Sequence, residues 1–296
     1  MKVIKTGLSG FVGRNLSEYL SNHSFIVQSI SLRNSDWKDK FTADAIIHLA
    51  GKAHDTKNTS DASEYFKVNT ELTKDLFDEF LKSEIRDFIY FSSVKAVADE
   101  VCDILFEDVI PDPKTPYGQS KLQAEEYILS REIPKDKRVF IIRPCMIHGP
   151  GNKGNLNLLY KIVSKGIPWP LGAFENKRSF LSIDNLCFVI KELLERAAIP
   201  SGIYNLADND SLSTNELIEL LGQSLGKQNR IMKISESLIK KTASLGDILK
   251  LPLNSERLQK LTENYVVSNK KIREAIGKEL PISAKEGLLI TFESFK

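Results

Sequence analysis

The sequence is poor in cysteine and has no long apolar run. Its 296 residues include three cysteines, Cys102, Cys145 and Cys187, which lie too far apart to form a paired motif. Such spacing is typical neither of a disulfide framework nor of a zinc site, so we expect no metal centre and a reducing, cytoplasmic setting. A glycine-rich turn begins at residue 7, which leaves no room for a signal peptide, and no segment has the length of a membrane span. We therefore expect neither export nor membrane insertion.

An excess of charge of one sign is also missing. The 41 Lys and Arg residues nearly balance the 39 Asp and Glu residues, which gives a net charge of +2 with both signs interspersed. Proteins that bind nucleic acid or anionic membranes usually carry a basic stretch or a strongly positive balance. The composition therefore predicts neither partner.

Short apolar runs alternate with amphipathic stretches in the first half of the chain. The runs at residues 3–5, 25–31, 45–50, 88–91 and 139–142 are predicted strands. Alternating strands and helices predict an α/β fold with a doubly wound parallel sheet and helices on both faces. Beyond Gly149 we expect a smaller, mainly helical cap, with helices near 155–165, 183–196 and 213–225. The expected division is 1–149 and 150–296, partly interleaved because residues 203–206 can return to the first sheet.

A glycine-rich turn joins the first predicted strand to a helix. Residues 6–13 read TGLSGFVG. Three glycines at this spacing, between a strand and a helix, are typical of the Rossmann-type turn that binds the pyrophosphate of a dinucleotide. The expected cofactor contacts in this turn are Gly7, Ser9, Gly10, Phe11, Val12 and Gly13.

The second predicted strand lacks the acidic residue that usually binds the adenosine ribose. Arg33 follows this strand, and an arginine in that position favours the extra phosphate of NADP over NAD. Two alternatives stay open: Arg33 can point into solvent, and Asp36 can reach the ribose. We therefore expect NAD or NADP, with a preference for NADP.

The third predicted strand ends in small residues. Leu49, Ala50 and Gly51 follow it and let the backbone pass close to a bound nucleotide, so they are further expected cofactor contacts. His48 lies within the apolar run, and we interpret it as a packed core residue with no chemical role.

A tyrosine and a lysine four residues apart open a predicted helix. Tyr117 and Lys121 share one helix face, where an ammonium group and a cationic cofactor ring would stabilise the phenolate of a tyrosine whose ordinary pKa is about 10. Tyr117 is thus a candidate general acid/base. Ser93, at the end of the fourth predicted strand, is the candidate that binds the same substrate oxygen, with Ser92 as the alternative.

Together these motifs resemble the extended short-chain dehydrogenase/reductase family, also called the NAD-dependent epimerase/dehydratase family. The resemblance covers essentially the whole chain. It implies catalytic roles for Ser93, Tyr117 and Lys121, and contacts of the last two with the cofactor. It also implies an enzyme that acts on a nucleotide sugar and forms a homodimer. A role in bacterial polysaccharide biosynthesis follows from the resemblance alone.

The resemblance also implies substrate contacts in the second half of the chain. Arg178 is expected to bind the diphosphate because a guanidinium can bind phosphate through two hydrogen bonds, and Asn155 and Arg257 are further candidates. The sequence is most similar to reductases of 4-keto-N-acetylhexosamine nucleotides. The alternatives are a nucleotide-sugar 4-epimerase that retains NAD and, more remotely, a non-catalytic dinucleotide sensor.

Overall fold

The structure is a computed structural model that describes residues 1–7, 10–33, 37–38, 41–52, 61–152, 154–249 and 254–296. Two residues considered for the cofactor, Ser9 and Asp36, lie outside these ranges. No helix within them has both the length and the apolarity that a bilayer crossing requires.

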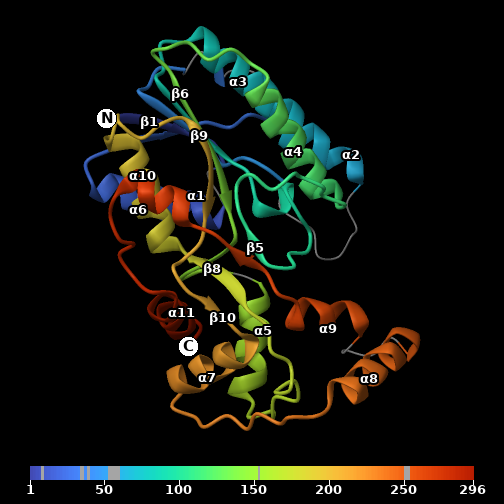
Figure 1. The fold of residues 1–296 in the computed structure, drawn as a ribbon. Coiled ribbons are helices and arrows are strands. Elements are labelled where there is room, and N and C mark those ends of the chain that lie inside the picture. Colours follow the sequence, from blue (N-terminus) through green and yellow to red (C-terminus); the bar gives the residue numbers. More distant parts are fainter. Residues whose placement is uncertain (8–9, 34–36, 39–40, 53–60, 153, 250–253) are drawn as a thin grey trace.

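A six-stranded parallel sheet forms the centre of the fold (Figure 1). Its order is β2 (Ile26–Ser29), β1 (Lys2–Lys5), β3 (Ala45–His48), β4 (Asp87–Phe91), β6 (Arg138–Pro144) and β9 (Gly202–Leu206). Every residue of β3 and β4 is buried, as expected for strands covered on both faces. The order changes direction between β1 and β3, and ligands of such sheets bind at the carboxyl ends of the strands beside that point. The predicted doubly wound α/β fold is confirmed.

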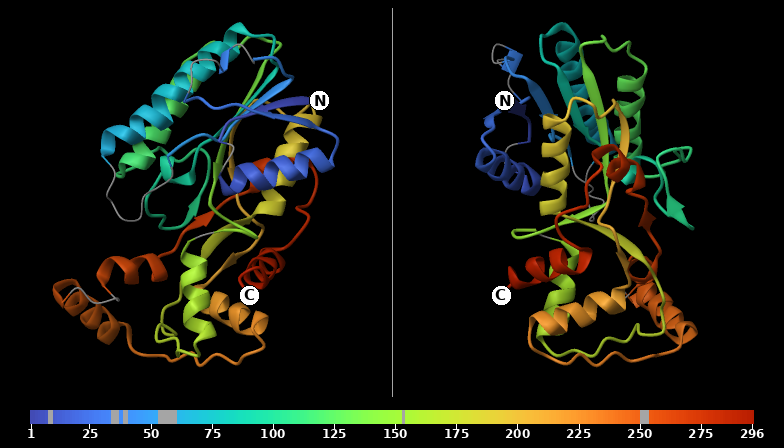
Figure 2. Two further views of the ribbon diagram at one scale, coloured as in Figure 1. Left: turned by 180° about the vertical axis from the view of Figure 1, so that it is seen from behind. Right: turned by 60° about the vertical axis from the view of Figure 1, so that its left-hand side comes forward.

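Helices cover both faces of this sheet (Figures 1 and 2). One layer contains α1 (Phe11–Asn22), α6 (Ile183–Glu195) and α10 (Lys270–Ile276). The other contains α2 (Ala62–Tyr65), the π-helix η2 (Phe66–Glu71), α3 (Leu72–Lys82) and α4 (Pro116–Leu129). Successive strand residues point to opposite faces, so Val3 packs toward the first layer and Ile4 toward the second.

The remaining elements build a second part around its own apolar core. A three-stranded sheet has the order β10 (Ser211–Leu212), β8 (Arg178–Ser182) and β7 (Met146–His148). Helices α5 (Asn155–Ser164), α7 (Thr214–Ser224), α8 (Glu236–Leu249), α9 (Ser255–Thr262) and α11 (Ala284–Glu293) surround it. Two short strands, β5 (Ile104–Leu105) and β11 (Val266–Val267), pair with each other, and the 3-10 turn η3 (Val94–Ala96) follows β4. We propose that the division lies near Gly149, with α6, β9 and α10 crossing back to the first sheet.

Candidate active site

The glycine turn after β1 packs directly against the end of β3. Gly7 has a φ of +73°, and a Cβ atom there would lie 2.9 Å from the backbone nitrogen of Ala50. Only glycine fits, because both the backbone conformation and the space exclude a side chain. Gly10 then precedes α1 as its N-cap and offers no side chain to cap it, and among the described residues no side chain takes that place, which suits an anion at this helix end. The turn therefore suits the diphosphate of a dinucleotide.

Beneath this turn lies a buried lysine that sequence reasoning missed. Lys5 is fully buried and donates to the backbone oxygen of Gly13 at 2.5 Å and to the hydroxyl of Ser17. Burial lowers the pKa of Lys5. Its positive charge adds to that of the α1 amino terminus, so it strengthens the attraction for a phosphate group.

His48 links the glycine turn to the opposite helix layer. The hydroxyl of Thr6 accepts the N–H of Ala50 at 2.9 Å and donates to Nδ1 of His48 at 2.8 Å. On the other side of the ring, Nε2 lies 2.8 Å from the hydroxyl of Thr73, which itself donates to the backbone oxygen of Asn69. Nε2 therefore carries the imidazole proton. His48 is a packed core residue, as predicted from its apolar run, and its hydrogen bond with Thr6 helps to hold the glycine turn in place.

The titration of His48 should make folding sensitive to acid. Burial, with a contribution from the charge of Lys121, lowers the pKa of His48 to about 3, below the unfolded value of about 6.5. The stabilisation is complete above the unfolded pKa and is lost as the pH falls below it, by about 1.4 kcal/mol per pH unit. Urea unfolding between pH 7.5 and 5 should show a steeper loss for the natural protein than for His48→Gln. Parallel pH profiles would contradict this assignment.

Asn69 holds the loop after β3 against α4, and its position within the π-helix η2 gave no signal in the sequence. Its side chain accepts the N–H of Lys52 at 2.7 Å and donates to the oxygen of Lys52 at 3.1 Å and to the hydroxyl of Ser120 at 3.0 Å. A Cβ on Gly51 would lie 3.0 Å from Asn69 Oδ1 and 3.2 Å from Lys121 Nζ. The predicted cofactor residue Gly51 therefore lies beside the predicted catalytic Lys121.

Helix α4 places the predicted catalytic tyrosine at the end of β4. Thr115 caps the helix by accepting the N–H of Gly118 at 3.2 Å, and Pro116 occupies its first turn. A Cβ on Gly118 would lie 2.3 Å from the backbone oxygen of Lys95, so α4 begins in direct contact with the turn that follows β4. This contact brings Tyr117 next to Ser93.

Ser93, Tyr117 and Lys121 form one cluster. Burial raises the pKa of Tyr117 above its ordinary value, against the opposing effect of a hydrogen bond with the Ser93 side chain. The buried Lys121 donates to the backbone oxygen of Phe91 at 2.8 Å. Burial lowers the pKa of Lys121 to about 8, against the opposing effect of the Glu125 carboxylate, so the side chain is mainly protonated at neutral pH. The cluster can transfer a proton to an oxygen held beside Ser93 and Tyr117.

A buried ion pair lies one helical turn beyond Lys121. Glu125 accepts from Nε of Arg143 at 3.1 Å to each carboxylate oxygen and from Nη2 at 2.5 Å. Ser92, the alternative to Ser93, donates its hydroxyl to Glu125. Ser92 is therefore engaged in holding β4 to α4, which leaves Ser93 as the serine that faces Tyr117.

The predicted substrate residues lie on the second part of the molecule. Arg178, in β8, pairs with Glu263 at 3.4 Å and donates to the backbone oxygen of Lys260. Asn155 is the exposed first residue of α5, and Arg257 is exposed on α9. Arg33 is exposed beyond β2, which ends two residues earlier than predicted, at Ser29.

Lys95 is a further cation near the reactive cluster. Its ammonium lies 4.2 Å from the centre of the Tyr265 ring and donates to the backbone oxygen of Asp99 at 2.6 Å. Burial lowers the pKa of Lys95, against the opposing effect of the Glu263 and Asp99 carboxylates. Lys95 therefore places a partly buried cation two residues after Ser93.

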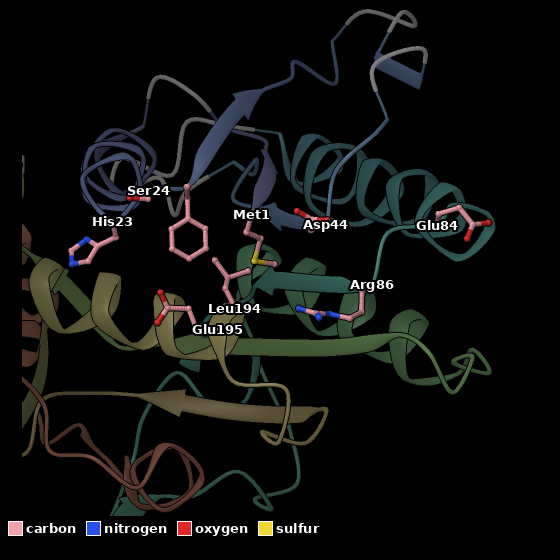
Figure 3. Close-up of a pocket in the computed structure, with 9 residues that line it drawn as sticks. Met1, His23, Ser24, Asp44, Glu84, Arg86, Leu194 and Glu195 are labelled. Atoms are coloured by element: carbon pink, nitrogen blue, oxygen red, sulfur yellow. The ribbon is translucent and has the colours of Figure 1, made fainter.

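A hollow of about 580 Å³ lies at the opposite edge of the sheet (Figure 3). Met1, Asp44 and Arg86 line it, and each directly precedes a strand, β1, β3 or β4. The hollow therefore lies at the amino ends of the strands, whereas ligands of open α/β sheets bind at the carboxyl ends. It is separate from the cluster around Tyr117.

Comparison with known proteins agrees with this arrangement. Residues 3–207 match the NAD dependent epimerase/dehydratase family. The UDP-glucose 4-epimerase of Vibrio cholerae is 28% identical to this chain. The alignment, of 319 residues with its gaps, covers 99% of this chain and 95% of that protein. The GDP-6-deoxy-D-mannose reductase of Pseudomonas aeruginosa is 28% identical over 74% of this chain and 79% of its own length. The structure of RMD from Pseudomonas aeruginosa in complex with NADPH has a TM-score of 0.76 and 23% identity, with 100% of this chain and 99% of that one covered.

The family match spans the glycine turn, the cluster of Ser93, Tyr117 and Lys121, and the whole parallel sheet. The two curated relatives named above are a nucleotide-sugar epimerase and a nucleotide-sugar reductase. This chain is therefore an enzyme that belongs to the NAD dependent epimerase/dehydratase family.

Proposed function

We propose that this enzyme is a reductase that acts at C4 of a nucleoside-diphosphate 4-keto-N-acetylhexosamine. The observation that carries the proposal is the cluster of Ser93, Tyr117 and Lys121 beside the glycine turn. When bound, a nicotinamide dinucleotide supplies the hydride for such a reaction. The glycine turn suits this group, because Gly7 permits the φ of +73° and the close packing against Leu49 and Ala50 that bring the turn to the amino terminus of α1, where an anion can bind.

The three residues divide the proton chemistry between them. Ser93 donates a hydrogen bond to the carbonyl oxygen at C4 and keeps it within reach of Tyr117. Tyr117 gives its proton to that oxygen as negative charge develops there. Lys121, held by the Phe91 carbonyl, stabilises the resulting phenolate with its positive charge.

NADP is the proposed form of the cofactor. Arg33 is exposed just beyond β2, where its guanidinium can bind a 2′-phosphate through two hydrogen bonds. A protein of the same fold, RMD from Pseudomonas aeruginosa, has been solved with NADPH. The backbone at Leu49 and Ala50, the turn residue Ser9 and the α1 amino terminus complete the proposed contacts.

Arg178 is proposed to bind the diphosphate of the substrate, with Asn155 and Arg257 as further contacts. Arg178→Ala should raise the KM for the nucleotide sugar about 10- to 100-fold with a smaller effect on kcat, because it removes charged hydrogen bonds to a part of the substrate remote from the reaction. Arg178→Lys is the matched control and should recover part of the affinity, since it keeps the charge but loses the planar geometry. An unchanged KM in Arg178→Ala would remove this residue from the substrate site.

A second candidate function is nucleotide-sugar 4-epimerisation, favoured by the 99% coverage of this chain by the Vibrio cholerae UDP-glucose 4-epimerase. The two functions differ in how they use the cofactor. An epimerase must keep its cofactor while the ketone intermediate turns over in the site, whereas a reductase exchanges it after each turnover. A homodimer is proposed for either function.

The test is to purify the protein, denature it and identify any released nucleotide by mass spectrometry. We expect an empty site that binds NADPH in preference to NADH, and oxidation of NADPH on addition of a nucleotide 4-ketosugar. Stoichiometric bound NAD with interconversion of C4 epimers would establish the epimerase instead. Binding of a dinucleotide without turnover would favour the non-catalytic sensor, and failure to bind either dinucleotide would contradict all three functions.

A further inference from the structure

Helix α8 presents an apolar stripe to solvent as well as one to the protein. Ile239, Ala243 and Gly246 are its buried residues, and the first two belong to the core of the second part. Its exposed apolar residues are Leu238, Leu245, Ile248 and Leu249, with exposed fractions of 54%, 51%, 77% and 58%. The last three follow Leu238 by seven, ten and eleven residues. These spacings put all four side chains on one side of a helix. We call these four residues the α8 face.

Figures 1 and 2 show α8 at the end of an arm that it forms with α9, away from the central sheet. The α8 face is thus far from the helices that cover the sheet. Four large apolar side chains on one projecting helix form a patch of the kind that marks an interaction site, whereas single exposed apolar residues need no such explanation.

The same part of the chain is strongly basic. Residues 226–262, from the end of α7 to the end of α9, contain eight Lys and Arg against three Asp and Glu, a net charge of +5. Since the whole chain carries +2, all other residues together carry −3. The overall balance, from which we expected no membrane partner, conceals this local excess. The exposed cations among the described residues of this region include Lys227, Arg230, Lys233, Lys240 and Lys241.

Lys241 lies within the α8 face itself. It follows Leu238 by three residues and precedes Leu245 by four, so its Cβ is on the same side of the helix. A lysine in this position can lay its aliphatic stem along apolar surface while its ammonium reaches outward. An exposed apolar stripe that contains a lysine, on a helix in a basic region of the chain, has the composition of a helix that lies in the interface of an anionic bilayer.

The charge also argues against a second copy of this chain as the occupant. A symmetric dimer through the α8 face would bring two basic regions, each of +5, against each other. An anionic lipid surface instead offers charge of the opposite sign together with apolar volume. We propose that the α8 face docks this enzyme on an anionic membrane surface, with the 14-residue helix lying parallel to the bilayer. This inference does not depend on the reaction proposed above.

The experiment is co-sedimentation of the full chain with vesicles. We expect binding to vesicles of phosphatidylcholine with one quarter phosphatidylglycerol, weaker binding to pure phosphatidylcholine, and a loss of binding in high salt. Leu245→Ser/Ile248→Ser should lower the partition coefficient at least about tenfold, because it removes two apolar side chains from the bilayer contact. Both positions are exposed, so the fold should tolerate the change.

The matched control is Ile110→Ser/Leu129→Ser, which alters two residues of similar exposure, 87% and 57%, outside α8. It should bind vesicles as the natural protein does. Absence of binding to the anionic vesicles, or equal losses in the two double variants, would overturn the proposal. A light-scattering result in which Leu245→Ser/Ile248→Ser dissociates an oligomer while vesicle binding is unchanged would assign the face to a second copy instead.

Discussion

Tyr117→Phe should lower kcat about 10²- to 10⁴-fold, the usual contribution of a positioned general acid. The change removes one hydroxyl, which is hydrogen-bonded with the Ser93 side chain and which we propose to be the proton donor to the substrate. The ring remains, so packing at the amino end of α4 and the affinity for the cofactor should change little. Steady-state oxidation of NADPH with a nucleotide 4-ketosugar measures the turnover, and fluorescence titration of NADPH measures the binding.

Tyr127→Phe is a suitable control on the same helix. Tyr127 donates its hydroxyl to Asp78 at 2.7 Å, and this bond joins α4 to α3 at a distance from Ser93. The variant also loses one tyrosine hydroxyl, yet it should keep normal turnover. Wild-type turnover in Tyr117→Phe, or an equal loss in Tyr127→Phe, would show that Tyr117 does not transfer the proton.

Arg143→Met should destabilise the protein by about 3–5 kcal/mol at neutral pH. The side chains of Arg143 and Glu125 are 3% and 1% exposed, so the substitution leaves a carboxylate buried without its guanidinium partner. The same carboxylate accepts a hydrogen bond from the hydroxyl of Ser92, next to Ser93, the proposed catalytic serine. Urea unfolding followed by circular dichroism gives the free energy of unfolding of each variant.

The double variant Glu125→Gln/Arg143→Met separates two contributions to the loss of stability: the unpaired Glu125 carboxylate and the lost packing of the guanidinium. It should regain most of the lost stability, because no ionised group remains in the buried site. If Arg143→Met alone is as stable as the natural protein, or if the double variant is no better than the single one, the pair does not contribute as described.

Signals confined to a short stretch of sequence could be interpreted before the structure was known. The glycine turn could be located from sequence because its strand, turn and helix are contiguous. Gly7 has the positive φ that such a turn requires. The Tyr117 and Lys121 spacing predicts a shared helix face in the same way. The placement of Ser93 followed from the rule that ligands bind at the carboxyl ends of parallel strands.

Other parts of the site depend on residues far apart in sequence. Glu125 and Arg143 are 18 residues apart, and no pattern within either segment indicates that they meet. The π-helix η2 inserts an extra residue per turn, so the regular helical period does not predict that Asn69 points toward the loop after β3. The exposure of the α8 face could not be predicted from sequence either, because periodicity indicates an apolar face but not whether the rest of the protein covers it.

The contact between Asn69 and the loop after β3 has an evolutionary consequence. Both hydrogen bonds to residue 52 involve backbone atoms, its N–H and its carbonyl oxygen, so the side chain at that position is not needed for the contact. The neighbouring Gly51 is more constrained, because a Cβ there would lie 3.0 Å from Asn69 Oδ1 and 3.2 Å from Lys121 Nζ and would displace both side chains. The Asn69 contact therefore places no demand on the side chain at position 52, whereas Gly51 and Asn69 should be retained together among orthologues.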